Sequence, residues 1–167
     1  MKLALDLESV LADTNEVALQ STDKLDPEHF EDGWGLSDKQ WETYVKVTDA
    51  AWRHNPQSIP PEEENIDRYV SKLREAGNEI HILTAREWVD EQILWWLEEK
   101  EIEYDSFEST SSPKHEYDYD IFIDDNPELW GECRLLLRDQ PWNNHIDTSS
   151  SRSSHRIYSL EEVNKFI

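Results

Sequence analysis

The hydrophobic positions of this 167-residue chain fall into short apolar runs that alternate with amphipathic segments. The runs lie at residues 2–7, 79–83, 104–107, 119–123 and 134–137. Polar or charged residues bound each run, which is typical of buried strands. Segments 62–76 and 87–100 instead repeat apolar residues at helical spacing. Strands that alternate with helices in this way predict an α/β fold, with a Rossmann-like parallel sheet sandwiched by helices.

Residues 14–60 do not follow this rhythm. They are rich in aromatic residues, have helical spacing between Lys39 and Trp52, and interrupt the connection after the first strand. An insertion at that point would stand over the C-terminal edge of the sheet, so we expect a small helical cap. The alternative is an extra helical layer with no role in the active site. The expected core then comprises residues 1–13 and 61–147.

The C-terminal residues 148–167 have a different composition. Five serines fall within residues 148–155, which predicts a linker. Ser159 and Glu162 have the spacing of a capping box, which predicts a last helix that ends near Phe166. We therefore expect a Ser-rich linker followed by a C-terminal helix; the alternative is a tail that packs back on the core as an extra layer.

Carboxylates follow two of the apolar runs. Asp6 ends the first run, and Asp124 and Asp125 follow the run at 119–123. The carboxyl ends of parallel strands form the edge at which open α/β sheets bind ligands, so these three side chains should converge there. Converging carboxylates repel one another unless a cation lies between them, and oxygen ligands suit Mg²⁺. The pattern therefore predicts one cation site at this edge.

Thr84 and Lys114 are further candidates for the same edge. Thr84 follows the run at 79–83 and offers a hydroxyl and an N–H to a phosphate oxygen, although a threonine there is also a common helix N-cap. Lys114 lies in the loop before the run at 119–123, where a lysine is usually exposed. Neither residue identifies a function by itself.

The net charge of the chain is extreme. Thirty-eight acidic residues stand against sixteen basic ones, which gives a formal charge of −22 spread along the sequence. Nucleic-acid polymers and anionic membranes should repel such a protein. Eight Trp, six Tyr and four Phe argue against a disordered acidic chain. We favour a halophilic protein whose acidic surface is adapted to high salt, where screening weakens self-repulsion; the alternative is an ordinary acidic protein.

Three negative observations bear on location. The chain has no apolar run of about 18 residues, so no membrane-spanning helix is expected. Its first residues do not resemble a signal peptide. The single cysteine, Cys133, excludes an internal disulfide and a zinc site built from cysteines. We expect a cytoplasmic location, and the sequence predicts no particular oligomeric state.

Four segments in order resemble the motifs of the haloacid dehalogenase superfamily. They are residues 6–13, residues 82–86, Lys114 and residues 123–127, each at the expected end of a strand. The resemblance covers the chain to about residue 147. Finer details resemble the cytosolic 5′-deoxyribonucleotidase-like branch. They are Ile59-Pro60-Pro61 before a helix, Thr84-Ala85-Arg86, Asp124-Asp125-Asn126-Pro127 and residues 137–143.

The resemblance implies a catalytic role for four residues. Asp6 would be the nucleophile that forms an aspartyl-phosphate, and Glu8 would be the general acid and base. Thr84 and Lys114 would hold the phosphoryl oxygens. The implied substrate is a small phosphorylated molecule and, in the nearest branch, a nucleoside 5′-monophosphate.

The resemblance also implies a metal. Mg²⁺ would be bound by Asp6, Asp124 and the backbone carbonyl of Glu8, and Asp125 would support it. The implied function is therefore Mg²⁺-dependent hydrolysis of a phosphomonoester.

The first motif departs from the family pattern Asp-x-Asp-Gly at two positions. Glu8 replaces the second aspartate and adds a methylene, and a positioning error of about 1 Å can cost roughly 10²-fold in rate. Ser9 replaces glycine at a turn that often needs the freedom of glycine. Two alternatives follow: a non-catalytic phosphate- or nucleotide-binding protein of this fold, or a phosphatase for another small phosphorylated metabolite.

Overall fold

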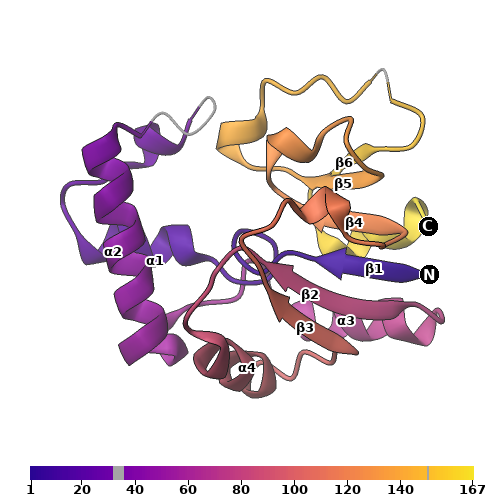
Figure 1. The fold of residues 1–167 in the computed structure, drawn as a ribbon, viewed down its shortest axis with the longest axis horizontal. Coiled ribbons are helices and arrows are strands. Elements are labelled where there is room, and N and C mark those ends of the chain that lie inside the picture. The colour runs from indigo at the N-terminus through magenta and orange to yellow at the C-terminus, as the bar shows by residue number, and fades with distance from the viewer. Residues whose placement is uncertain (32–35, 150) are drawn as a thin grey trace.

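The computed structural model describes residues 1–31, 36–149 and 151–167. Its centre is a six-stranded sheet in which every neighbouring pair is parallel, in the order β3-β2-β1-β4-β5-β6 (Figure 1). The strands are β1 (Lys2–Leu5), β2 (Glu79–Thr84), β3 (Ser106–Ser109), β4 (Ile121–Asp124), β5 (Leu135–Arg138) and β6 (His155–Ile157). The α/β class with a Rossmann-like parallel sheet is confirmed, and each of the five expected strands is present.

Helices flank this sheet. The α-helices of the described residues are α1 (Thr14–Ser21), α2 (Asp38–His54), α3 (Ile66–Glu75) and α4 (Asp90–Glu99). Shorter 3₁₀ segments lie at Pro27–Phe30, Pro56–Ser58, Lys114–Glu116, Pro127–Leu129, Pro141–Asn143 and Leu160–Lys165. Among the residues described, none of the helices combines the length and apolar character that a membrane span requires.

Three helices are shorter than the sequence pattern predicts, because residues with positive φ interrupt them. Asn65 has φ 62° and Trp88 has φ 70°, so α3 and α4 begin just after these positions and not at residues 62 and 87. Gly131 has φ 91°, and the helix expected over residues 127–133 is only a 3₁₀ turn. Local turns therefore override the apolar periodicity at these ends.

Residues 14–60 contribute α1 and α2, which lie beyond the C-terminal ends of the strands (Figure 1). The segment leaves and returns to the sheet at one place, because Ala12 and Pro61 form an antiparallel bridge and the Asp13 N–H donates to Pro60 O at 2.9 Å. Residues 32–35 of this segment lie outside the described part of the chain. Its role as a cap stays a prediction.

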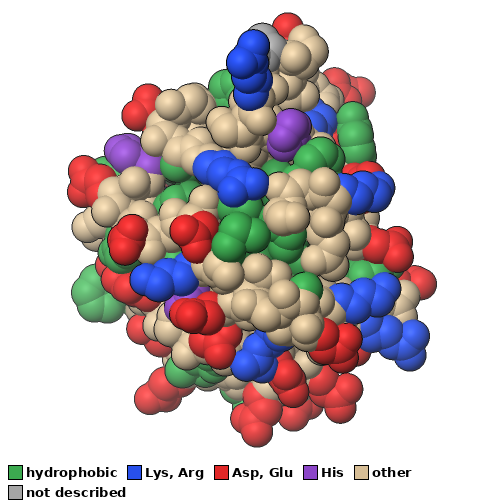
Figure 2. All heavy atoms as spheres, turned by 90° about the vertical axis from the view of Figure 1, so that its right-hand side faces the viewer, with side chains coloured by type: hydrophobic (Ala, Val, Ile, Leu, Met, Phe, Trp, Pro, Cys, Tyr) green, Lys and Arg blue, Asp and Glu red, His purple; other side chains and the backbone are tan. Residues whose placement is uncertain are grey.

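Figure 2 shows the opposite face, on which the two termini lie in Figure 1. Acidic and basic side chains both occur there, and carboxylates gather in the lower part of the view. The face is mixed in charge and lies away from α1 and α2.

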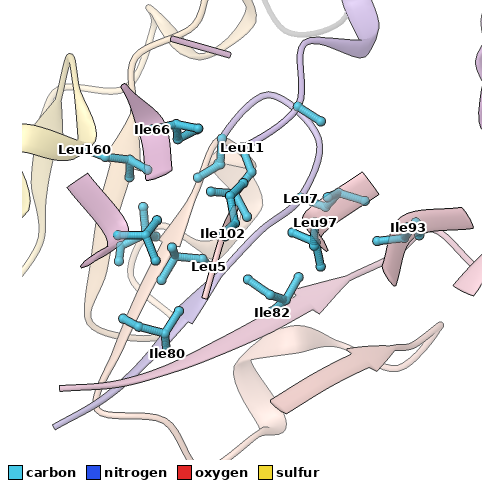
Figure 3. Packing of buried hydrophobic residues seen from close by; sticks show 14 of the residues in the cluster. Leu5, Leu7, Leu11, Ile66, Ile80, Ile82, Ile93, Leu97, Ile102 and Leu160 are labelled. Atoms are coloured by element: carbon cyan, nitrogen blue, oxygen red, sulfur yellow. The ribbon is translucent and has the colours of Figure 1, made fainter. Parts of the chain in front are cut away.

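The largest hydrophobic cluster covers the sheet face that packs against α3 and α4 (Figure 3). Leu5 and Ile82 come from neighbouring strands, and Ile66 of α3 and Leu97 of α4 pack with them. These four side chains are at most 3% exposed. Each buried aliphatic side chain contributes roughly 1.5–3 kcal/mol, so this packing holds the strand ends in register.

A smaller cluster covers the other face of the sheet. Phe122 and Leu137 belong to it, and the half-buried Tyr117, Tyr119 and Trp130 pack against it from the connections. Short segments therefore cover this face, whereas α3 and α4 cover the first.

The C-terminal segment differs from the expected linker and helix. Residues 155–157 form β6, which pairs with β5 from Leu136↔His155 to Arg138↔Ile157, so the last strand is not the one at 134–137. Arg156 of β6 donates to Asp139 Oδ1 at 2.7 Å and to Asn143 Oδ1 at 2.6 Å. The strand escapes prediction because it is only three residues long and mostly polar. The expected final helix is a 3₁₀ segment over Leu160–Lys165.

Candidate active site

Two aspartates mark the place where the strand order of the sheet reverses. Asp6 follows β1, and Asp124 ends the neighbouring strand β4. The Asp6 N–H donates to Ile123 O at 2.9 Å, which continues the ladder between the two strands. Ligand oxygens of Asp6, Asp124 and Asp125 all lie within 4.8 Å of one another. The convergence expected from the strand ends is therefore present at the topological switch point, where α/β sheets bind ligands.

Lys114 lies between two of these carboxylates. Its Nζ is 2.8 Å from Asp6 Oδ1 and 2.7 Å from Asp124 Oδ2. The side chains of Lys114, Asp6 and Asp124 are 11%, 12% and 2% exposed. Lys114 is thus not a solvent-exposed loop lysine, because the 3₁₀ turn Lys114–Glu116 brings it to the same edge.

The cluster carries more negative than positive charge. Burial, and then the charge of Asp124, raise the pKa of Asp6 to about 7 although Lys114 opposes the shift. Burial and the charges of Asp124 and Asp6 also raise the pKa of Asp125 well above its usual range. Burial lowers the pKa of Lys114, but the two carboxylates more than offset this and raise it. One lysine does not neutralise three aspartates, so a further cation would stabilise their ionised forms.

The remaining acceptor atoms fit a hard divalent cation. Asp125 Oδ2 accepts a hydrogen bond from Trp142 Nε1 at 2.8 Å, and Asp124 Oδ1 accepts one from the Asn126 N–H at 2.9 Å. Within the described residues, Asp125 Oδ1 and Asp6 Oδ2 accept none. Carboxylate oxygens are the ligands that Mg²⁺ and Ca²⁺ use, so this aspartate cluster could hold a metal ion.

Thr84 lies at the end of β2, the other neighbour of β1. It is 1% exposed, and its Oγ1 accepts a hydrogen bond from the Arg86 N–H at 3.1 Å. Because α4 begins only at Asp90, Thr84 is not the N-cap of that helix. Its hydroxyl closes the turn after the strand and keeps a proton to donate.

Glu8 has different surroundings from the three aspartates. Its Oε1 accepts from Trp52 Nε1 at 3.2 Å, Arg86 Nε at 3.2 Å and Arg86 Nη2 at 2.8 Å. Its Oε2 accepts from Arg86 Nη2 at 3.0 Å. Arg86 also donates to Thr48 Oγ1 at 3.0 Å. Glu8 is therefore fixed by the loop after β2 and by α2.

Ser9 adopts the backbone conformation that the family's glycine allows. Its φ is 60°, in the left-handed region, and it is 2% exposed. Asn15 Nδ2 donates to Ser9 Oγ at 3.0 Å, and Gln140 Nε2 donates to Ser9 O at 3.0 Å. The sequence suggests that a serine would be strained here, and these contacts show what holds it in place.

Sequence reasoning assigns no role to Arg86, Thr48 or Trp52. Arg86 is noted only as part of a motif, and Trp52 only as part of a helical pattern. Their contacts with Glu8 or with one another span 38 to 78 positions in the chain. The aromatic indole donors and the only arginine of the motif are the signals that could have pointed to them.

Comparisons with solved structures identify the fold. A dehalogenase described with an intermediate complex matches with a TM-score of 0.66 and 14% identity, over 99% of this chain and 96% of that one. A predicted phosphatase from Clostridium acetobutylicum matches with a TM-score of 0.65 and 12% identity, over 98% of this chain and 96% of that one. An L-2-haloacid dehalogenase matches with a TM-score of 0.58 and 12% identity, over 99% and 97%.

The chain therefore has the haloacid dehalogenase-like fold. No family model matches the sequence, and no curated protein matches it. The 5′-deoxyribonucleotidase-like branch stays a prediction.

Proposed function

We propose that this protein is a phosphomonoesterase that acts through an aspartyl-phosphate on Asp6. The observation that supports this most directly is Lys114 Nζ, which lies 2.8 Å from Asp6 and 2.7 Å from Asp124 at the switch point of the sheet. A carboxylate nucleophile beside a fixed cation can attack a phosphoryl group whose charge the cation offsets. The phosphatases and dehalogenases among the structural matches share this fold, which adds support.

In the first step, a carboxylate oxygen of Asp6 bonds to phosphorus and the ester P–O bond breaks. The leaving oxygen keeps the bonding electron pair and takes a proton from Glu8. Lys114 and the Thr84 hydroxyl would hold the phosphoryl oxygens. In the second step Glu8 takes a proton from water, the water oxygen attacks phosphorus, and the bond from phosphorus to Asp6 breaks. Inorganic phosphate leaves, and both carboxyl groups return to their first state.

Mg²⁺ is the cation that we propose for the site. Asp6, Asp124 and the backbone carbonyl of Glu8 would hold it, with Asp125 in support. When bound, it would offset the negative charge of the phosphoryl oxygens.

A nucleoside 5′-monophosphate is the substrate we favour. Helix α2 carries Trp41, which is 47% exposed and stacks on Tyr44 with ring centroids 5.4 Å apart. The same helix reaches the site through Thr48 and Trp52. Exposed aromatic surface on the helix that reaches the site suits a base, since aromatic rings stack on one another. A phosphatase for another small phosphorylated metabolite is the closest alternative.

A non-catalytic phosphate-binding protein is the second candidate. The contacts of Glu8 favour a binding protein, because both of its carboxylate oxygens already accept hydrogen bonds from Arg86, and one of them also from Trp52. Ser9 favours it too, since it replaces glycine at φ 60°.

The test is hydrolysis of p-nitrophenyl phosphate and a panel of nucleoside 5′-monophosphates, with Mg²⁺ or with a chelator. We expect turnover that needs Mg²⁺ and falls at least about 10³-fold in Asp6→Asn, because an amide is a poor nucleophile and metal ligand. Asp118→Asn makes the same substitution at a fully exposed side chain and should not change turnover.

Two outcomes would contradict the proposal. Wild-type turnover in Asp6→Asn with saturating Mg²⁺ would exclude Asp6 as the nucleophile. Absence of turnover at every KCl concentration, with phosphate binding retained, would favour the binding protein.

A further inference from the structure

Glu8 is held by two parts of the molecule, the loop after β2 and the helix α2. Arg86 comes from the loop after β2, and Trp52 comes from α2. Arg86 also donates to Thr48 Oγ1, one helical turn before Trp52. The Thr48 hydroxyl in turn donates to Tyr44 O at 2.9 Å, so it is free to accept from Arg86. These contacts join α2, the β2–α4 loop and Glu8 into one hydrogen-bonded unit.

The unit is largely withdrawn from water. Trp52 and Thr48 are 0% exposed, and the side chains of Arg86 and Glu8 are 11% and 23% exposed. Trp52 also packs edge-on against Trp96, with ring centroids 5.9 Å apart. A guanidinium and a carboxylate held in this setting have a fixed geometry, because the fork of arginine matches both carboxylate oxygens.

The two oxygens of Glu8 are used unequally. Among the described residues, Oε1 accepts three hydrogen bonds and Oε2 accepts one. A carboxylate oxygen has two lone pairs, so Oε1 is saturated and Oε2 keeps one lone pair for a further hydrogen bond. The extra methylene of glutamate, compared with the family's aspartate, provides the reach for this arrangement.

We propose that Arg86 is a positioning residue that fixes the Glu8 carboxylate through both oxygens, together with α2, so that the remaining lone pair of Oε2 exchanges the proton with the leaving oxygen and with water. The inference rests on the proposed phosphatase function. In this arrangement Oε2 of Glu8 gives its proton to the leaving oxygen while the P–O bond breaks, and regains one from the attacking water. In this role Arg86 acts through Glu8, with which it forms its ion pair.

The leaving group of the substrate separates this role from a structural one. An alkyl oxygen needs a proton as it departs, whereas p-nitrophenolate does not. In Arg86→Ala we expect kcat for glycerol 2-phosphate to fall at least tenfold more than kcat for p-nitrophenyl phosphate, since misplacement by about 1 Å can cost 10²-fold. A loss of structure alone would lower both rates equally. The readout is therefore the ratio of the two kcat values, with Mg²⁺ present.

Further variants keep the experiment decisive. Arg86→Lys keeps the charge but loses the fork, so the ratio should shift in the same direction by a smaller factor. Arg86→Ala placed on Glu8→Gln should change the ratio less than about twofold, because residues that act as a unit are not additive. Arg53→Ala removes an exposed arginine of α2 that pairs with Asp49, and it should leave the ratio unchanged.

The outcomes separate the two proposals. A ratio within about twofold of wild type in both Arg86→Ala and Arg86→Lys overturns the positioning role and leaves the phosphatase intact. If Arg86→Ala does not fold, Arg86→Lys alone decides. Absence of Mg²⁺-dependent turnover in the wild type on both substrates overturns the proposed function, and the positioning role with it.

Discussion

Glu62 lies where residues 14–60 return to the sheet, and its surroundings stabilise the negative charge of its carboxylate poorly. Its Oε1 accepts from Gln140 Nε2 at 2.6 Å, but its Oε2 is buried without a hydrogen-bond partner among the described residues. Burial, and then the charge of Asp13, raise the pKa of Glu62 from 4.5 to about 7; Glu63 adds to this, and Gln140 and Arg138 oppose it. A carboxyl with a higher pKa in the folded than in the unfolded state destabilises the fold once it ionises.

This gives a pH-dependent prediction for Glu62→Gln. The destabilisation is absent below about pH 4.5 and complete above about pH 7, so the variant should gain stability over wild type as pH rises through that interval. The gain at pH 8 should be roughly 1–3 kcal/mol, measured as the free energy of unfolding in urea. Glu64→Gln, at the exposed position two residues on, should show no such gain. A variant less stable than wild type at pH 8 would contradict this.

Whether a site residue can be predicted from the sequence depends on which element places it at the site. Asp6 and Asp124 are predictable because each ends an apolar strand, and parallel strands bring such ends together. The sequence identifies Lys114 as a site residue only through the resemblance to the haloacid dehalogenase motifs. The contact between Glu8 and Arg86 spans 78 positions and depends on the turn after β2, so no local pattern contains it.

At the scale of elements, Glu63 joins the C-terminal segment to the sheet. Its Oε1 accepts from the Leu160 N–H at 2.8 Å, and its Oε2 accepts from Ser159 Oγ at 2.6 Å. The same carboxylate lies 3.2 Å from Arg138 Nη1 on β5, and the two side chains are 16% and 7% exposed. The buried pair of Glu63 and Arg138 therefore links three parts of the chain. They are the final 3₁₀ segment, the residues just before α3, and β5.

Glu63→Gln should be strongly destabilising. The substitution removes the carboxylate that lies 3.2 Å from the buried Arg138, and breaking a buried pair costs about 3–5 kcal/mol in similar cases. Glu161→Gln is the matched control, since it removes the exposed pair with Lys72 at 3.8 Å and should cost less than about 1 kcal/mol. Urea unfolding of both variants measures the difference. Equal losses would mean that the buried pair adds nothing to stability.

The elements themselves were predictable where apolar residues formed runs or helical stripes. The strands β1, β2, β4 and β5 are such runs, because both of their faces are buried. The strand β6 was not predictable in this way, because two of its three residues are the polar His155 and Arg156. Pairing with β5 holds it in place. The starts of α3 and α4 depend on the positive φ of Asn65 and Trp88. Asparagine adopts this conformation more often than most residues, but tryptophan does not, so only the turn at Asn65 has a sequence signal.

At the scale of the whole molecule, charge is the distinctive property. The chain carries a formal charge of −22, yet it forms a sheet with two hydrophobic faces. On the face in Figure 2, carboxylates gather in the lower part of the view. Self-repulsion of this kind opposes the compact state in dilute buffer, and cytoplasmic location and adaptation to salt stay predictions from the sequence.

Salt should therefore stabilise the fold. Between dilute buffer and about 1 M KCl the Debye length falls to about 3 Å, so repulsion between exposed carboxylates is largely removed. We expect the melting temperature to rise steadily across that range in the presence of a chelator, so that cation binding at Asp6, Asp124 and Asp125 does not contribute. KCl and tetramethylammonium chloride at equal ionic strength should act alike if screening is the cause. A melting temperature that stays constant or falls with KCl would show that the acidic composition is not an adaptation to salt.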